Sequence, residues 1–219
     1  MQKRSFDYIL FDFDGVIVDS EILATKSILE VLEPYGCALT ELEYSQRFSG
    51  MMEYEVFKVL QNELDIADVE ACTVAYKKLF WSKYDAEFQC ITGMHELVTQ
   101  LSVPASVVSN SNINYLQKSV TKVGLLSNFE QLFSAQMVTN PKPFPDLYNY
   151  AAEELSLDRA TAIVVEDSPT GVKAAKEAGF SVIGFLGAGH IFEGHKDLLL
   201  RNGADYIAQN AQELQAILN

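Results

Sequence analysis

Short apolar runs that alternate with helical segments are the feature that most constrains the fold of this 219-residue chain. Apolar residues recur at helical spacing near 113–123, 146–155 and 169–178. Such alternation predicts a Rossmann-like, doubly wound α/β fold, in which helices cover both faces of a parallel sheet. The predicted strands, which are short and rich in β-favouring residues, span 8–13, 105–108, 132–135, 162–165, 182–185 and, at an edge, 205–207.

One long segment interrupts this alternation directly after the first predicted strand. Apolar residues recur there only at helical spacing, and neither glycine nor proline occurs between Gly50 and Gly93. We therefore expect an all-helical cap domain at 19–88, inserted into an α/β core formed by 1–18 and 89–219. Because open parallel sheets bind ligands at the carboxyl ends of their strands, we expect the cap above those ends.

The charge balance excludes two kinds of partner. The chain has 30 Asp and Glu against 16 Lys and Arg, a net charge of −14. Such a surface repels nucleic acid and anionic membranes, and no apolar run approaches the length of a transmembrane helix. Three scattered cysteines suit neither a zinc site nor a disulfide framework, which fits a reducing compartment. We expect a soluble, cytoplasmic protein.

Polar side chains follow the predicted strands at the points where the strands end. Each cluster alone is typical of a helix cap or a solvated surface. Because the carboxyl ends of parallel strands meet at one edge of the sheet, the clusters together predict a single site there. They comprise Asp12 and Asp14 after the first strand, Ser109, Asn110 and Ser111 after the second, Lys142 after the third, and Glu166 and Asp167 after the fourth.

This set of groups suits phosphoryl transfer. Carboxylates that share a small volume repel one another, and a hard dication such as Mg²⁺ resolves the conflict while retaining room for a phosphate oxygen. Lys142 supplies further positive charge, and the Ser109 hydroxyl and the Asn110 backbone N–H can donate to phosphate. Phosphoryl transfer requires positive groups that stabilise the negative charge developing on the phosphoryl oxygens, and a nucleophile placed in line with the bond that breaks.

Four motifs resemble, in order and spacing, the signature motifs of haloacid dehalogenase-like phosphatases. They are D-F-D-G-V at 12–16, Ser109 after a hydrophobic strand, K-P-F-P-D at 142–146 and E-D-S-P-T-G at 166–171. The helical insertion resembles the small cap of the β-phosphoglucomutase and phosphoglycolate phosphatase branch. The resemblance extends over essentially the whole chain and implies an Mg²⁺-dependent phosphatase, by default a monomer.

The resemblance also implies roles for the acids. Asp12 would attack the phosphate ester, become a transient aspartyl phosphate and contact Mg²⁺. Asp14 would protonate the leaving oxygen and later deprotonate the attacking water, with its carbonyl oxygen on the metal. Asp167 would bind the metal directly, and Glu166 would bind it directly or through water.

The remaining motif residues would hold the phosphate. The resemblance assigns this role to Ser109, Asn110 and Lys142, and it implies a cis peptide bond between Lys142 and Pro143. The substrate would be a small phosphorylated metabolite, with sugar and sugar-acid phosphates favoured and a hint of similarity to 6-phosphogluconate phosphatases. A cap loop that contains Arg47, Ser49 and Gly50 is expected to contact it.

Other functions remain open at this point. A β-phosphoglucomutase-like phosphosugar mutase is disfavoured by Ala24, where that branch carries a His, and by Ser49 and Glu53, where its basic residues would fall. A dehalogenase would lack Asp14. A non-catalytic phosphate-binding protein or receiver-like switch also gathers acids, a hydroxyl and a Lys on a parallel sheet, but receivers are shorter and have no helical insertion.

Overall fold

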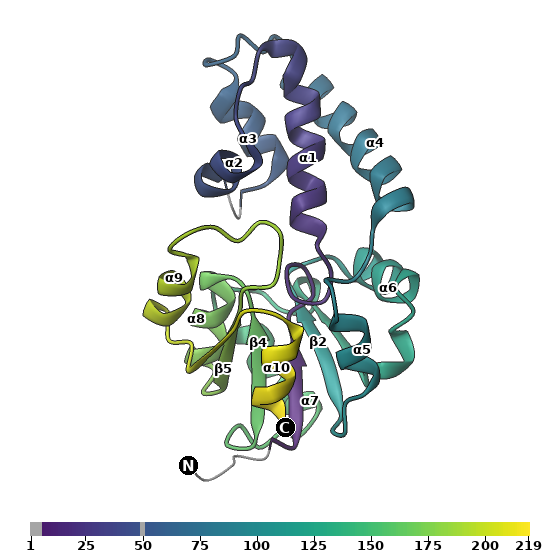
Figure 1. The fold of residues 1–219 in the computed structure, drawn as a ribbon, viewed down its shortest axis with the longest axis vertical. Coiled ribbons are helices and arrows are strands. Elements are labelled where there is room, and N and C mark those ends of the chain that lie inside the picture. Colours follow the sequence, from purple (N-terminus) through teal and green to yellow (C-terminus); the bar gives the residue numbers. More distant parts are fainter. Residues whose placement is uncertain (1–5, 49–50) are drawn as a thin grey trace. The chain divides into compact units, whose positions relative to one another are not determined.

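The computed structural model describes residues 6–48 and 51–219, and it confirms the predicted α/β class (Figure 1). Six parallel strands form one sheet in the order β3-β2-β1-β4-β5-β6. The chain builds outward from β1 to β3 and then returns to place β4 on the other side of β1. The strands are β1 Tyr8–Phe11, β2 Ala105–Ser109, β3 Leu132–Ser134, β4 Ala162–Glu166, β5 Ser181–Phe185 and β6 Tyr206–Ala208.

The strand order reverses beside β1, and this reversal locates the expected site. Phe11, the last residue of β1, lies opposite Val107 of β2 and Val165 of β4, so the three strands end within two residues of one another. In open α/β sheets the crevice outside such a switch point is where ligands bind. The loops after β1, β2 and β4 therefore carry the residues that the topology brings together.

Helices cover the sheet on both faces. Helices α7 and α8 bury a row of alanines against Leu10, Val164 and Val182 of the sheet, while α5 and α10 contact one another and lie side by side in front of the strands in Figure 1. Several helices begin at a side-chain cap, such as Asn112 before α6 and Ser168 before α8. Their bounds are α5 Met94–Thr99, α6 Ile113–Lys122, α7 Asp146–Glu154, α8 Pro169–Glu177, α9 His195–Arg201 and α10 Ala211–Leu218, with single 3₁₀ turns at Leu126–Asn128 and Ala135–Met137.

The chain divides into two compact units. The core unit comprises Met1–Val18, Gln89–Ala188 and Glu193–Asn219, and the helical unit comprises Asp19–Phe88 and Gly189–Phe192. The segment 189–192, which lies within the predicted core range 89–219, clusters with the helical unit. The backbone N–H of Gly189 donates to Asp19 Oδ2 at 3.0 Å, and this bond ties the segment to the start of the helical unit.

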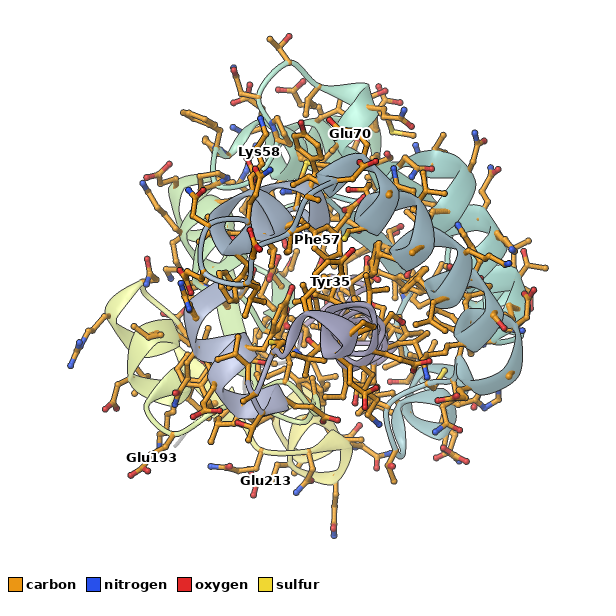
Figure 2. The ribbon with its side chains drawn as sticks, turned by 90° about the horizontal axis from the view of Figure 1, so that it is seen from above. Tyr35, Phe57, Lys58, Glu70, Glu193 and Glu213 are labelled. Atoms are coloured by element: carbon orange, nitrogen blue, oxygen red, sulfur yellow. The ribbon has the colours of Figure 1, made fainter. Side chains whose placement is uncertain are left out.

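The helical unit packs its own core. Phe57 is fully buried, whereas its neighbour Lys58 is exposed and stands over the Tyr54 ring; Figure 2 labels Phe57 and Lys58. A break at 61–68 that the sequence did not indicate has its cause in Asp65, which adopts a positive φ of 51°, and in Asp68, which caps the next helix. The elements are α1 Ser20–Leu32, a 3₁₀ turn Glu33–Tyr35, α2 Glu41–Phe48, α3 Glu53–Leu60 and α4 Val69–Glu87.

In the described ranges, 6–48 and 51–219, no helix combines the length and apolar character that a membrane crossing requires.

Candidate active site

Three carboxylates meet where β1 and β4 end. Asp12 follows β1 directly, and its backbone N–H donates to the Val165 carbonyl at 2.9 Å, which continues the pairing of the two strands. Glu166 is the last residue of β4, and Asp167 comes next. Oxygens of Asp12, Glu166 and Asp167 all lie within 4.8 Å of one another. Strand pairing alone therefore explains how residues so distant in sequence form one cluster.

The cluster is buried. Asp12 is 8% exposed, Glu166 0% and Asp167 3%. Burial raises the pKa of Asp12 well above its usual range; Lys142 opposes this shift, and the neighbouring Glu166 and Asp167 add to it. Buried carboxylates at this density favour a bound cation, and an all-oxygen donor set suits a hard divalent ion such as Mg²⁺.

Lys142 provides positive charge in the same place. Its Nζ atom donates to Asp12 Oδ1 at 2.8 Å, to Glu166 Oε1 at 2.6 Å and to the Val108 carbonyl at 2.7 Å. Burial lowers the pKa of Lys142, but the two carboxylates raise it by more, so the net shift is upward and the ammonium stays charged. Lys142 thus bridges the ends of β1, β2 and β4.

The loop that carries Lys142 is held by Asn110. The Asn110 side chain donates to the Lys142 carbonyl at 2.9 Å and accepts from the Lys142 backbone N–H at 3.1 Å. The peptide bond between Lys142 and Pro143 is cis. The Asn110 side-chain amide is therefore engaged by this loop, and the Asn110 backbone N–H is the group that we expect to contact phosphate.

The carboxylate of Asp14 accepts three hydroxyl hydrogen bonds. Ser111 Oγ donates to Asp14 Oδ2 at 2.6 Å, and the Tyr115 hydroxyl donates to Oδ1 at 2.9 Å. Ser109 Oγ also reaches Oδ2, at 3.5 Å. Residues from the end of β2 and the first turn of α6 therefore orient Asp14.

Sequence reasoning missed Tyr148 and His195. Tyr148, on α7, is fully buried, and its hydroxyl donates to Glu166 Oε1 at 2.8 Å. His195, at the start of α9, has Nε2 2.6 Å from the Asp167 carbonyl, so the hydrogen resides on Nε2. Both residues resemble ordinary helix residues in the sequence, where nothing indicates the direction of their side chains.

Glu166 is further enclosed by the turn that follows it. Its Oε2 atom accepts from Ser168 Oγ at 3.0 Å, in addition to the two donors on Oε1. A Cβ atom at Gly171 would stand 2.0 Å from the Glu166 carboxyl group, so only glycine allows this close approach. The motif at 166–171 thus fixes the direction of the Glu166 carboxylate.

The predicted cap loop is only partly described. Arg47 forms an ion pair with Glu63, and its guanidinium stands 4.8 Å from the centre of the Phe48 ring. Ser49 and Gly50 lie outside the described residues. The Arg47 side chain is therefore engaged with groups of the helical unit itself.

Comparison with known proteins identifies similar sequences and structures. The family described as haloacid dehalogenase-like hydrolase matches residues 9–185. The chain is 31% identical to 6-phosphogluconate phosphatase of Escherichia coli K12 over 83% of either chain. It is 28% identical to the phosphorylated carbohydrates phosphatase of Thermotoga maritima, over 87% of this chain and 89% of that one.

One solved structure has a similar fold over nearly the whole chain. A haloacid dehalogenase-like protein of unknown function from Agrobacterium tumefaciens superposes with a TM-score of 0.88 and 32% identity, over 98% of both chains. The similarity therefore includes both the parallel sheet and the helical insertion.

Proposed function

The chain belongs to the haloacid dehalogenase-like hydrolases and is a phosphatase of that family, and from this premise we propose that it hydrolyses a small phosphorylated carbohydrate through an aspartyl phosphate. The observation that carries the proposal is the buried cluster of Asp12, Glu166 and Asp167, with Lys142 bonded to two of its members. Clusters of this kind combine a nucleophile with the positive charge that a phosphoryl group requires.

Mg²⁺ is the proposed cofactor. Asp12 and Asp167 would hold it through their carboxylates, and Asp14 through its backbone carbonyl. The Glu166 carboxylate accepts hydrogen bonds from Lys142, from Tyr148 and from the turn after β4, which favours a supporting role over direct coordination. When bound, the ion neutralises charge on the phosphoryl oxygens.

Asp12 is the proposed nucleophile. Its carboxylate oxygen attacks phosphorus, the new oxygen–phosphorus bond forms, and the bond from phosphorus to the alcohol oxygen breaks. Lys142 holds Asp12 Oδ1 at 2.8 Å and so fixes the orientation of the carboxylate for in-line attack. Such a step divides one difficult displacement into two easier ones.

Asp14 is the proposed general acid and base. It gives a proton to the departing alcohol oxygen and later takes one from the water that attacks the aspartyl phosphate, which releases phosphate and restores Asp12. The hydroxyls of Ser111 and Tyr115, at 2.6 and 2.9 Å, hold its carboxylate in place between these transfers. Ser109, Lys142 and the Asn110 backbone N–H are the proposed phosphate contacts.

Phosphate release tests the proposal. Phosphorylated sugars, sugar acids and p-nitrophenyl phosphate would be offered to the wild-type chain with Mg²⁺, to the same chain with EDTA, and to Asp12→Asn. We expect hydrolysis only with both Mg²⁺ and Asp12, and a loss of about 10⁴-fold or more in the variant. Release that survives in Asp12→Asn would contradict the mechanism, and isomerisation of a sugar phosphate without release would favour a mutase.

A further inference from the structure

The first residue of α9 contacts the loop that follows β4. His195 has its Nε2 atom 2.6 Å from the carbonyl oxygen of Asp167, which lies 28 residues earlier in the chain. Both residues are 3% exposed, and both belong to the core unit. We propose that His195 is a positioning residue for the metal centre: its imidazole holds the main chain at Asp167 so that the Asp167 carboxylate faces the other two acids of the cluster. This inference rests on the proposed function, in which Asp167 binds Mg²⁺.

The sheet no longer holds the main chain at Asp167. The pairing of β4 with β1 ends at Val165, and its pairing with β5 ends at Glu166. Helix α8 begins only at Pro169. Asp167 therefore lies between two regular elements, where a buried carbonyl needs a donor from elsewhere in the fold. His195 supplies such a donor.

The peptide group that joins Asp167 to Ser168 is held at both ends. His195 contacts its carbonyl oxygen, and its N–H donates to Glu166 Oε2 at 3.4 Å. Because a peptide group is planar, contacts at both ends fix the rotation of the plane about the chain. The Ser168 hydroxyl also donates to Glu166 Oε2, at 3.0 Å. The direction of the chain at Asp167, and with it the direction of the Cα–Cβ bond, is therefore set by groups outside the Asp167 side chain.

The charge of the acid cluster makes such a hold necessary. Oxygens of Asp12, Glu166 and Asp167 lie within 4.8 Å of one another, and the last two acids both raise the pKa of Asp12. Lys142 forms ion pairs with Asp12 at 2.8 Å and with Glu166 at 2.6 Å. Like charges at this separation repel, so the Asp167 carboxylate on an unrestrained main chain would turn away from the other two. A fixed main chain keeps this ligand in place before a cation arrives, which strengthens cation binding.

Helix α9 gives the imidazole a rigid base. Leu199, one turn beyond His195, is fully buried and packs into the core cluster with Val164 and Val182 of the sheet. The helix also contacts α8 and β5, and Figure 1 shows it beside α8. Gly194, which precedes the helix, adopts a φ of 90°, a left-handed conformation that glycine takes without strain. Packing and chain conformation therefore fix the start of the helix, and with it the Cα atom of His195.

A buried histidine that bonds to a carbonyl can also serve packing alone, and the two roles differ in what a variant changes. A packing role predicts a loss of stability with no particular effect on metal affinity. A positioning role predicts a loss of metal affinity that is reversed when another side chain supplies the same donor.

Two amide variants test the inference. The amide nitrogen of His195→Gln can lie near the position of Nε2 and donate to the Asp167 carbonyl, whereas the shorter side chain of His195→Asn does not reach it. Mn²⁺ is titrated without substrate into the full chain and followed by the electron paramagnetic resonance signal of the free ion, and Mg²⁺ is then measured by competition. We expect both dissociation constants to rise about tenfold or more in His195→Asn and by less than about threefold in His195→Gln.

Leu214→Ala separates destabilisation from positioning. Leu214 is fully buried on α10, which packs against α5 and β6, so this variant loses apolar contacts on elements other than those that carry the acids. We expect its thermal midpoint to fall while its dissociation constant for Mn²⁺ stays within about twofold of the wild-type value. Affinity that follows the thermal midpoint across all three variants would overturn the inference.

The amide pair gives two further ways to overturn it. Equal affinities in the wild type and His195→Asn would do so, and so would a loss of the same size in His195→Gln, because the hydrogen bond would then not be the cause. If His195→Asn does not fold, His195→Leu also lacks the donor and carries the same expectation.

Asp167→Ala distinguishes two kinds of failure. If this variant and the wild type bind Mn²⁺ alike, Asp167 is not a ligand, and the metal centre of the proposed function fails together with the inference. If Asp167→Ala weakens binding while the His195 variants do not, the metal centre stands and the inference alone fails.

Discussion

The acid cluster of the core unit and a cavity of the helical unit, which Thr25 and Ser45 help to line, differ in how their polar groups are satisfied. Around Asp12, Lys142 donates to three acceptors and Asp14 accepts from three donors. In the cavity, the described residues offer the Thr25 and Ser45 hydroxyls no hydrogen-bond partner. The acid cluster is therefore organised before substrate arrives.

Removal of Lys142 should produce the largest change in this comparison. Lys142→Met leaves two buried carboxylates without their ammonium partner, and we expect the metal-free protein to lose about 3–5 kcal/mol of unfolding free energy. Urea denaturation in EDTA measures this loss, with Lys173→Met on the exposed face of α8 as the control. A loss no greater than in the control would show that the cluster does not depend on Lys142.

The Asp12 carboxylate, when ionised, should destabilise the metal-free fold. The pKa of Asp12 is higher in the folded state than in the unfolded chain, where it is about 4, so protonation of Asp12 favours folding. This stabilisation is fully present below about pH 4 and is lost as the pH rises through the pKa of Asp12 in the folded state. Asp12→Asn removes this dependence, so in EDTA the variant should exceed the wild type by about 1 kcal/mol or more near pH 7. Thermal melts across pH test this, and identical pH profiles would contradict it.

Tyr148 should have a smaller effect, on the metal requirement. Tyr148→Phe removes the hydroxyl that donates to Glu166, and we expect the Mg²⁺ concentration for half-maximal rate to rise about tenfold. Tyr150→Phe, two residues along α7 and only partly buried, is the matched control. If both variants keep the wild-type metal requirement, Tyr148 contributes to packing alone.

The cavity hydroxyls should contribute least to stability. Ser45→Ala removes a hydroxyl for which the described residues offer no hydrogen-bond partner, so the unfolding free energy should change by less than about 0.5 kcal/mol or increase. Ser106→Ala in the core is the matched comparison, because its hydroxyl bonds to Tyr8 and accepts from the Gln131 N–H. A larger loss at Ser45 than at Ser106 would invert the comparison.

The sequence predicted the sheet well because its strands are short, apolar and buried on both faces. The predicted run 162–165 and the observed strand β4, Ala162–Glu166, differ by one residue. The acid cluster followed from the same logic, since strand ends converge whatever the intervening sequence. The roles assigned to Asp12 and Asp14 remain predictions.

The remaining features depend on side-chain direction and on local backbone choices that no periodicity encodes. Tyr148 and His195 are helix residues whose partners lie on other elements. The segment Gly189–Phe192 joins the helical unit through a bond to Asp19, 170 residues earlier in the chain. The break at 61–68 depends on Asp65 adopting a left-handed conformation without a glycine to signal it.

The central claim is that Asp12 becomes phosphorylated, and an acid quench tests it most directly. Asp14→Asn would be mixed with p-nitrophenyl phosphate and Mg²⁺, because this leaving group needs no proton whereas breakdown of the intermediate requires a base. Mass spectrometry of the quenched, digested protein should then find phosphate on Asp12. Phosphate on another residue, or a burst of nitrophenol with no phosphorylated peptide, would contradict the account.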